Sequence, residues 1–378
     1  MPGITTPLID FCSDVAGAGH QFLEEELFNR ALCRERKRAE RSDSSLLLVV
    51  LDLTLYRVKV EREKVVKVLA HHIPEGMRET DVCGWRKCGE SMGILFTLVA
   101  VNDVATSLRA VELKVRDRLQ QWLTPSLYQK MILIFRLFPD NNCLIGKEKE
   151  YTLLFYPDVM EQSPEARVMD GVKRCMNFTG SVSVLLLLAP LTLAIALMVK
   201  LTSKGPVLFR QERMGQYGKP FMLLKFRTMY ADNDDSIHRS YVKSLIAGGN
   251  RSEGAESEGE VFKIKDDPRV TPLGRFLRKF SLDEVPQFIN VLKGEMALVG
   301  PRPAIAYEVD SYAPWHRCRV LARKPGITGL WQVTGRSLTT FDEMVRLDLR
   351  YIRNCSIWLD IKLLLATPKA VIHGKGAY

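Results

Sequence analysis

Two adjacent carboxylates, Asp283 and Glu284, stand between groups of cations in this sequence. The flanking cations are Arg275, Arg278 and Lys279 before the pair and Arg302 after it. Clustered cations next to acidic side chains form an arrangement that handles anions. The stretch from Phe280 to Gln287 is therefore the first candidate for a functional site.

The local sequence allows two starts for a helix here. Ser281 and Glu284 have the spacing of a capping box, but Pro286 would then lie inside the helix and remove a hydrogen bond. With Asp283 at the cap, Pro286 falls in the first turn, where its missing N–H matters little. The carboxylates would then stand at the positive end of a helix, where a phosphate can also dock. This local chemistry favours phosphate transfer.

Length and charge bound the remaining possibilities. The 378 residues are enough for about two domains, and the 46% hydrophobic content supports packed cores. The net charge of +10 favours an acidic partner, either nucleic acid, anionic lipid or a phosphate-bearing small molecule. The basic segments lack the interleaved aromatic residues of a nucleic-acid binder, so we expect no nucleic-acid partner. The N-terminus does not have the pattern of a secretory signal, which favours the cytoplasmic side.

Residues 1–160 form the first predicted unit, in which helical and strand patterns alternate. Helices are expected over 24–40, 61–72 and 102–123, and strands over 45–53, 80–100 (a pair, with a turn near 87–90) and 131–138. This alternation predicts an α/β sandwich.

The order of these elements resembles the catalytic domain of GGDEF-type diguanylate cyclases. Asp52 matches the metal-binding Asp at the end of the first strand of that family, and Lys87–Ser91 falls where its Gly-Gly-Asp-Glu-Phe hairpin would be. Only Glu90 agrees with the hairpin signature. The resemblance implies a degenerate, regulatory domain, and Asp52 could equally be a carboxylate that caps a turn.

The most hydrophobic stretch is Val182–Val199, 18 residues without a charge. A helix of this length spans roughly 27 Å, slightly less than a hydrocarbon core of about 30 Å. Pro190 lies at its centre and predicts a kink. Cations flank both ends, namely Lys173 and Arg174 before, on a helix that would carry them to a membrane surface, and Lys200 and Lys204 after. Positive charge prefers the cytoplasmic face. We expect a helix that enters the membrane and returns, with a straight membrane-spanning anchor as the alternative.

Beyond this stretch, two strands are predicted over 206–213 and 221–229, with Lys225 and Arg227 on one face of the second strand. Paired cations of this kind suit a diphosphate. A long surface loop is expected over 231–260. The apolar pattern of 341–369 predicts a helix, either in the membrane interface or in the core.

Six motifs of the second half, taken together, closely resemble the bacterial sugar transferase family, the monotopic polyprenyl-phosphate sugar-1-phosphate transferases. They are Lys204–Arg213, Lys225–Met229, Asp267–Thr271, Leu282–Gln287, Gly300–Pro303 and Pro325–Gly335. Ala189 replaces a Ser that often precedes the proline of the family's membrane helix, so the kink would depend on Pro190 alone.

The resemblance implies a two-step exchange. Asp283 would attack the sugar-bearing phosphate of a UDP-sugar to give a phosphosugar-aspartyl intermediate and release UMP, and polyprenyl (undecaprenyl) phosphate would then displace Asp283. Glu284 would hold Mg²⁺ or assist the acceptor. Candidates for substrate binding are Lys225, Arg227, Arg275, Arg278, Arg302, Gln332 and Arg336. The segment Pro325–Arg336 would be a loop over the donor nucleotide, or else a turn packed by Trp331.

The predicted fold class is α/β: an N-terminal cyclase-like α/β sandwich, plus a mainly helical α+β catalytic domain with a re-entrant membrane helix. The predicted domains are residues 1–160, 161–204 and 205–378. The expected location is the cytoplasmic face of a bacterial inner membrane, in contact with its lipid, and the chain could form a homodimer. The alternative function is a membrane-anchored nucleotide-sensing adaptor with an inactive transferase half.

Overall fold

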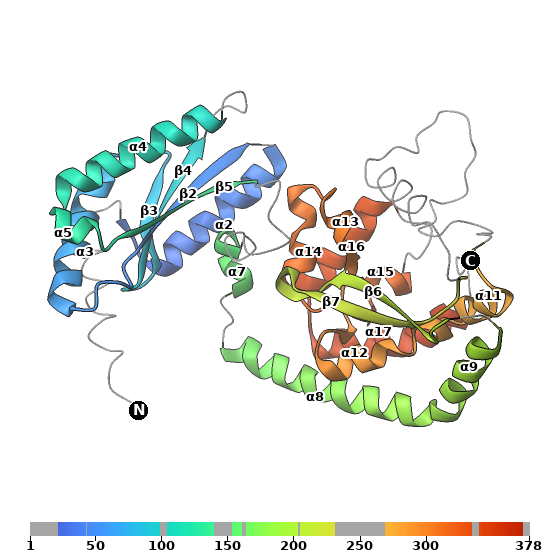
Figure 1. The fold of residues 1–378 in the computed structure, drawn as a ribbon. Coiled ribbons are helices and arrows are strands. Elements are labelled where there is room, and N and C mark those ends of the chain that lie inside the picture. The colour runs from blue at the N-terminus through green and yellow to red at the C-terminus, as the bar shows by residue number, and fades with distance from the viewer. Residues whose placement is uncertain are drawn as a thin grey trace. The chain divides into compact units, whose positions relative to one another are not determined.

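The computed structural model describes residues 22–42, 44–98, 104–139, 153–160, 164–202, 205–230, 269–334 and 340–372. Arg336 and the loop predicted over 231–260 lie outside these ranges. By its contacts the chain divides into two compact units, one of residues 1–143 and 150–161 and the other of residues 144–149 and 162–378. Figure 1 shows the elements of each unit, which we describe separately.

The first unit contains a five-stranded sheet in the order β1-β3-β4-β2-β5. Its elements are β1 (Phe22–Leu23), α2 (Glu25–Ser42), β2 (Ser45–Asp52), α3 (Lys59–Glu75), β3 (Val82–Lys87), β4 (Ser91–Leu98), α4 (Val104–Trp122), α5 (Pro125–Tyr128), β5 (Ile132–Phe138), η2 (Leu153–Phe155) and α7 (Pro157–Met160). Strand β2 is antiparallel to both β4 and β5, and β3 and β4 form a hairpin. From β2 to β5 the chain therefore follows the β-α-β-β-α-β order of ferredoxin-like folds.

Helices cover both faces of this sheet because β2 is apolar throughout its interior. Leu47, Val49 and Leu51 join one buried cluster with residues of α3 and α4. Helix α2 also packs on the sheet. Its Phe28 lies so close to Gly93 of β4 that a Cβ at Gly93 would come within 2.4 Å of the ring. The predicted alternation of helices and strands is confirmed, and the unit is a mixed α/β structure.

The carboxylate compared with the metal-binding Asp of the cyclases forms a local turn. The Oδ1 atom of Asp52 accepts a hydrogen bond from the backbone N–H of Thr54 at 2.8 Å, which is the behaviour of an Asp that caps a turn. In the β3–β4 turn, Lys87 pairs with Glu90 at 2.6 Å, and Gly89 adopts a φ of 71°. The resemblance of this unit to a cyclase stays a prediction.

The second unit is mainly helical, with two small sheets ordered β7-β6-β9 and β10-β8. Its elements are α8 (Pro164–Leu187), α9 (Ala189–Thr202), β6 (Leu208–Met214), η3 (Gln216–Gly218), β7 (Pro220–Phe226), α11 (Pro272–Lys279), η4 (Leu282–Glu284), α12 (Gln287–Lys293), β8 (Ala297–Val299), β9 (Ala304–Ile305), α13 (Ala306–Val309), η5 (Pro314–His316), α14 (Cys318–Leu321), β10 (Gly326–Thr328), α15 (Leu330–Thr334), α16 (Phe341–Arg353) and α17 (Ile357–Ile372). The strands predicted over 206–213 and 221–229 correspond to β6 and β7.

The apolar stretch around Pro190 forms two helices that meet at a sharp bend. Taking residues 167–187 of α8 with α9, the angle between the helices is 64°, and Pro190 is the second residue of α9. Among the residues that the structure describes, no single helix has the length and hydropathy needed to cross a membrane, whereas this bent pair meets both conditions together. The kink expected at Pro190 is thus observed at the first turn of α9.

The cations that precede the apolar stretch were expected to face a membrane surface, and this expectation is wrong. Lys173 forms an ion pair with Asp360 of α17 at 2.7 Å. Arg174 donates hydrogen bonds of 2.8 Å to the carbonyl oxygens of Val291 and Leu292, at the end of α12. Both side chains therefore fasten α8 to its own unit: Lys173 through the Asp360 carboxylate, and Arg174 through carbonyl groups that a helix end leaves without partners.

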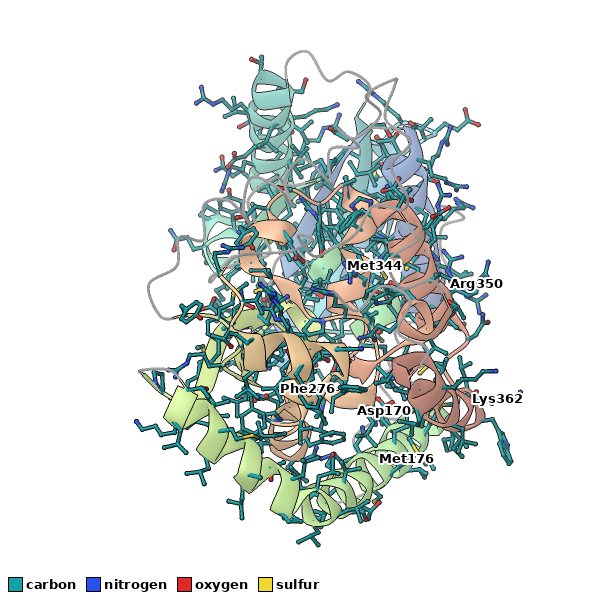
Figure 2. The ribbon with its side chains drawn as sticks, turned by 90° about the vertical axis from the view of Figure 1, so that its right-hand side faces the viewer. Asp170, Met176, Phe276, Met344, Arg350 and Lys362 are labelled. Carbon is teal, nitrogen blue, oxygen red and sulfur yellow. The ribbon has the colours of Figure 1, made fainter. Side chains whose placement is uncertain are left out.

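The segment predicted as one helix over 341–369 is two helices, and both contribute side chains to the core of the unit. Helix α16 begins with a capping box formed by Thr340 and Glu343 and buries Met344 and Tyr351 in the core. Helix α17 begins after a break and leaves Trp358 and Leu365 exposed. Figure 2 shows Met344 on α16 and Lys362 on α17.

Candidate active site

The carboxylate pair lies in a short 3₁₀ turn, η4, and neither predicted helix start is correct. Ser281 has a φ of 56° and caps nothing with its side chain, so the capping box is absent. Helix α12 begins at Gln287 with Pro286 as its N-cap residue. Pro286 therefore stands one turn after Asp283, and the chain enters α12 from a 3₁₀ turn in which Glu284 N–H bonds to the carbonyl oxygen of Ser281 at 3.2 Å.

The two carboxylates have different surroundings. Asp283 is buried, with 7% of its surface exposed, whereas the Glu284 side chain keeps 31% of its surface accessible. Lys225, near the end of β7, donates to Oε1 of Glu284 at 2.8 Å. The structure thus joins two predicted site residues that are 59 positions apart. A shielded carboxylate beside one neutralised by a cation suits two different chemical roles.

The turn that carries the pair is seated on the bent helix pair. Leu282 and Val285, on either side of the carboxylates, belong to one apolar cluster with Ile195 and Val199 of α9. Leu277 of α11 joins the same cluster. Asp283 is therefore held next to the apolar stretch Val182–Val199.

Helix α11 supplies the basic side of the site and is fixed to the strand that carries Lys225. Thr271 caps the helix by accepting from Gly274 N–H at 2.9 Å, and Gly274 approaches Thr228 so closely that a Cβ would come within 2.2 Å of the Thr228 carbonyl oxygen. Arg278 donates from Nε to the Thr228 hydroxyl at 2.9 Å. Arg275 is exposed one turn earlier on the same helix.

Arg227 follows the last residue of β7, and its guanidinium is buried. It lies against Gly205, where an added Cβ would come 2.3 Å from Nη1. Gly205 has a φ of 120°, which only glycine adopts easily. The backbone at Gly205 therefore lies close to Arg227, and this close approach explains the glycine in the Lys204–Arg213 motif.

Arg213 of β6 belongs to the electrostatics of the site, although the sequence analysis did not include it. Its guanidinium donates to the carbonyl oxygen of Pro303 at 2.8 Å. Burial lowers the pKa of Arg213 to about 10, with Glu308 opposing this shift and the nearby charge of Arg302 adding to it. Glu284 acts on the same guanidinium. The charges of both Arg302 and Glu284 thus act on Arg213, and the sequence signal for this residue was its position in the Lys204–Arg213 motif.

The glycines of the motifs at 300–303 and 325–335 allow two backbones to touch. In the parallel pair β8 and β10, Gly300 N–H donates to Thr328 at 2.9 Å and Gly326 N–H donates to Pro301 at 2.8 Å. A Cβ at Gly326 would lie 2.0 Å from the Gly300 nitrogen. Gly300 and Gly326 thus belong to a closely packed strand pair, and Trp331, in the helix that follows, is buried.

This strand pair places Arg302 over the Trp331 ring, with 5.9 Å between the guanidinium carbon and the ring centroid. Such a contact orients the guanidinium. The amide of Gln332, predicted to bind substrate, donates to the carbonyl oxygen of Ile327 at 3.1 Å. This hydrogen bond is structural, because it joins α15, which carries Trp331, to β10.

Helices α9 and α11, which pack near the carboxylate turn, expose several apolar side chains. On α9 the most exposed are Leu193, Leu197 and Leu201, and on α11 the most exposed apolar side chain is Phe276. In Figure 2 Phe276 lies above α8 and α9 in the view shown. Exposed apolar residues gathered around one helix pair mark an interaction surface rather than a solvated face.

Comparison with known proteins shows the family. Residues 168–374 match the family model described as bacterial sugar transferase, which is more than half of the chain. The chain belongs to the bacterial sugar transferase family. The match includes α8 and α9 together with the site described above, and no residue of the first unit falls within it.

The relatives divide by the part of their length that this chain covers. An undecaprenyl-phosphate galactose phosphotransferase of Salmonella typhimurium is 41% identical over 208 residues, 55% of this chain and 42% of the relative. An undecaprenyl-phosphate glucose phosphotransferase of Komagataeibacter xylinus is 42% identical over 221 residues, 54% of this chain and 37% of the relative. The exopolysaccharide production protein ExoY of Sinorhizobium fredii is 36% identical over 231 residues, 60% of this chain and 96% of that protein. The chain thus spans less than half of the first two relatives and nearly all of the third.

Proposed function

We propose that this protein transfers a sugar-1-phosphate from a UDP-sugar to polyprenyl phosphate and so starts a polysaccharide repeat unit. The observation that carries the proposal is the Asp283–Glu284 turn, which is packed on α9 and paired with Lys225 within a region that matches the family. Two of the relatives are named undecaprenyl-phosphate sugar phosphotransferases, which supports the acceptor.

In the proposed reaction, a carboxylate oxygen of Asp283 attacks the sugar-bearing phosphorus. The bond from that phosphorus to the bridging oxygen breaks, and UMP leaves with the electron pair. An oxygen of polyprenyl phosphate then attacks the same phosphorus, which regenerates the Asp283 carboxylate and gives a polyprenyl diphosphate sugar. Burial of Asp283 restricts its access to water, which limits hydrolysis of the intermediate.

Charge is the main barrier to this exchange, because two anionic phosphates and two carboxylates must come together. Lys225 neutralises part of the charge of Glu284. We propose that Arg278, Arg227 and Arg302, which stand on three separate segments of the unit, bind the substrate phosphates. Adjacent carboxylates are oxygen donors of the kind that Mg²⁺ takes in combination with substrate phosphates. We propose that Glu284 holds Mg²⁺, which when bound would neutralise charge on the diphosphate.

We also propose that α8 and α9 form a re-entrant membrane helix at the cytoplasmic face of the inner membrane. The 64° bend and the exposed apolar side chains of α9 support this arrangement. The proposed domains are a regulatory, cyclase-like unit over 1–160, the membrane segment over 161–204 and the catalytic domain over 205–378. Homodimerisation is also proposed, and the oligomeric state of the purified protein tests it. Protection of a tag at Met1 from cytoplasmic protease would contradict the re-entrant topology.

The test of the function measures UMP release by purified protein with Mg²⁺, polyprenyl phosphate and a panel of UDP-sugars that includes UDP-glucose and UDP-galactose. Wild type should release UMP with at least one donor, and Asp283→Asn should abolish release. Asp310→Asn, which changes an exposed carboxylate of the same unit, is the matched control and should keep activity. Without acceptor, mass spectrometry should find a phosphosugar adduct on Asp283.

Absence of UMP release with every donor would reject the enzyme and favour the nucleotide-sensing adaptor. Release that Asp283→Asn does not reduce would reject Asp283 as the nucleophile. If release depends on Asp283 but no adduct is found on trapping with a slow donor, the direct transfer to the acceptor replaces the covalent step.

A further inference from the structure

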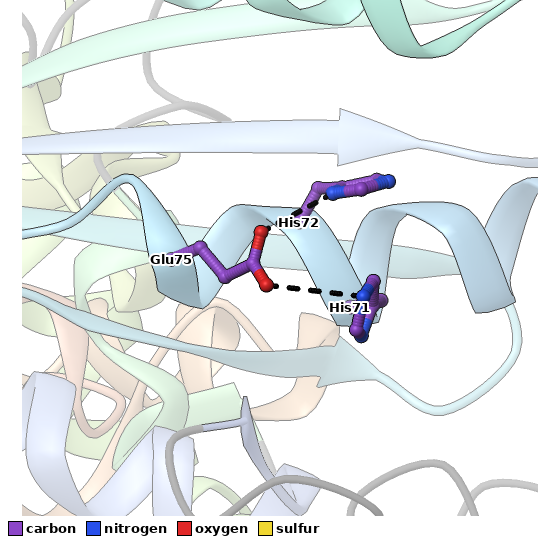
Figure 3. Close-up of side chains that lie close together, drawn as sticks. All are labelled: His71, His72 and Glu75. Atoms are coloured by element: carbon purple, nitrogen blue, oxygen red, sulfur yellow. Dashed lines mark hydrogen bonds and ion pairs between the residues drawn. The ribbon is translucent and has the colours of Figure 1, made fainter.

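Three side chains that can bind a metal ion converge in the last turn of α3, in the first unit and outside the family match. His71, His72 and Glu75 place one ligand atom each within 4.8 Å of one another. The Nε2 atom of His71 lies 3.8 Å from Oε1 of Glu75, and Nδ1 of His72 lies 3.3 Å from Oε2. Figure 3 shows the Glu75 carboxylate between the two imidazole rings.

The spacing follows from the helix. Residues three and four apart lie on one side of an α-helix, so Glu75 can reach back to both histidines. With bonds of about 2.0–2.1 Å to a tetrahedral ion, neighbouring ligand atoms stand roughly 3.3 Å apart. The separation between His72 and Glu75 already has this value, and the ligand atom of the exposed His71 lies within 4.8 Å of the other two.

Two further observations favour a cation at this place. The ring of His72 stacks on Trp122 of α4, with centroids 5.4 Å apart and planes 19° apart, which orients Nδ1. The cluster also lies at the C-terminal end of α3, where unpaired carbonyl groups give a partial negative charge. The site is therefore partly organised before any ion binds.

The donor atoms decide the class of ion. Imidazole nitrogens suit Zn²⁺, Cu²⁺ and Ni²⁺, whereas Mg²⁺ and Ca²⁺ take oxygen ligands. The guanidinium of Arg118 lies against Gly76, the residue after Glu75, so the surroundings are not strongly acidic and simple charge attraction would be weak. We propose that His71, His72 and Glu75 bind one divalent transition-metal ion, with water in the remaining coordination positions.

Binding is tested on the full-length protein carrying no histidine tag, by calorimetric titration with Zn²⁺ in excess Mg²⁺. The excess Mg²⁺ occupies oxygen-rich sites and leaves a nitrogen-rich one open. Wild type should bind Zn²⁺ with micromolar affinity at this site. His72→Gln and Glu75→Gln should each weaken binding by about tenfold or more, because the loss even of groups that only support a ligand costs 10–100-fold. With Cu²⁺ as the probe, electron paramagnetic resonance should show coupling to imidazole nitrogen that the double variant His71→Gln/His72→Gln lacks.

Glu63→Gln is the matched control, since Glu63 is a carboxylate on the same helix that pairs with Lys59 at 3.8 Å and has no histidine beside it in the sequence. It should bind Zn²⁺ as wild type does. The changed side chains are on the surface, so thermal unfolding of every variant should stay near that of wild type. The proposal is overturned if wild type shows no micromolar Zn²⁺ binding, or if the double histidine variant binds Zn²⁺ as tightly as wild type. It is equally overturned if Glu63→Gln reduces binding as much as Glu75→Gln.

Discussion

Gly326→Ala should disrupt the site although it adds only a methyl group. The new Cβ would lie 2.0 Å from the Gly300 nitrogen, 2.5 Å from the Thr328 carbonyl oxygen and 2.7 Å from the Gly300 Cα. All three are backbone atoms, so rotation of a side chain cannot relieve the contacts. Gly326 is not among the described residues with positive φ, so the effect is one of space and not of backbone conformation.

The magnitude follows from these distances. Real Cβ contacts essentially never fall below 3.0 Å, so β10 and β8 must separate by about 1 Å at the Gly300 nitrogen. Overpacking of this kind typically costs about 1–3 kcal/mol, which lowers the melting temperature by several degrees in a unit of this size. Arg302 and Trp331 move with the strands, and a misplacement of about 1 Å can reduce catalysis by about 100-fold.

The assay compares melting temperature and UMP release for Gly326→Ala and Gly171→Ala. Gly171 is exposed in α8, and an added Cβ would meet nothing within 4 Å. Alanine there should leave activity unchanged and stabilise the helix by up to about 1 kcal/mol. A flexible loop over the nucleotide would instead give Gly326→Ala a normal melting temperature with altered kinetics. A normal melting temperature for Gly326→Ala would therefore refute the packing interpretation.

Three other changes test separate parts of the second unit. Burial lowers the pKa of His316 to about 4, against the attraction of Asp342. As the pH falls from 7 to 5, His316 is protonated in the unfolded chain but not in the folded protein, so wild type should lose about 2 kcal/mol of unfolding free energy. His316→Gln should lack this loss in urea titrations. Asp348→Ala should cost about 3–5 kcal/mol, since it leaves Arg319 charged and buried where an ion pair of 2.9 Å stood, and the double variant Asp348→Leu/Arg319→Met should recover most of it. Lys225→Gln should change stability by less than about 1 kcal/mol, because the pair with Glu284 is partly exposed, while UMP release falls by about 100-fold.

Local sequence patterns predicted the helices and strands whose formation depends on neighbouring residues. The apolar run from Ser45 marks β2, and the helical period after it marks α3. Pro190 predicted the bend because a proline within an apolar run of helical length interrupts the helix, and the structure places it in the first turn of α9. Each of these outcomes depends on a few neighbouring residues, which is the information that a single sequence carries.

Contacts between distant segments could not be predicted in this way. Nothing near Lys173 indicates Asp360, and nothing near Arg174 indicates the end of α12, so these cations were assigned to a membrane surface on charge alone. The same limit applies to Arg213, whose burial beside Pro303 depends on the pairing of β6 with β9. Cations near an apolar helix can equally be anchors to protein carbonyls, and only the fold distinguishes the two.

The start of α12 shows how a local rule fails when tertiary packing competes with it. The capping rule predicts that the helix begins where a polar side chain can accept a hydrogen bond from a free backbone N–H. In the structure, η4 instead buries Asp283 and directs Leu282 and Val285 onto α9. Burial of Val285, at about 1.5–3 kcal/mol, together with partial burial of Leu282, outweighs a cap of about 1 kcal/mol. The cost is the left-handed backbone conformation of Ser281. Strained conformations of this kind are frequent at functional sites. Ser281→Gly should therefore keep or raise stability, whereas a β-branched Ser281→Val should lower it, and the difference measures how strongly this turn is held on α9.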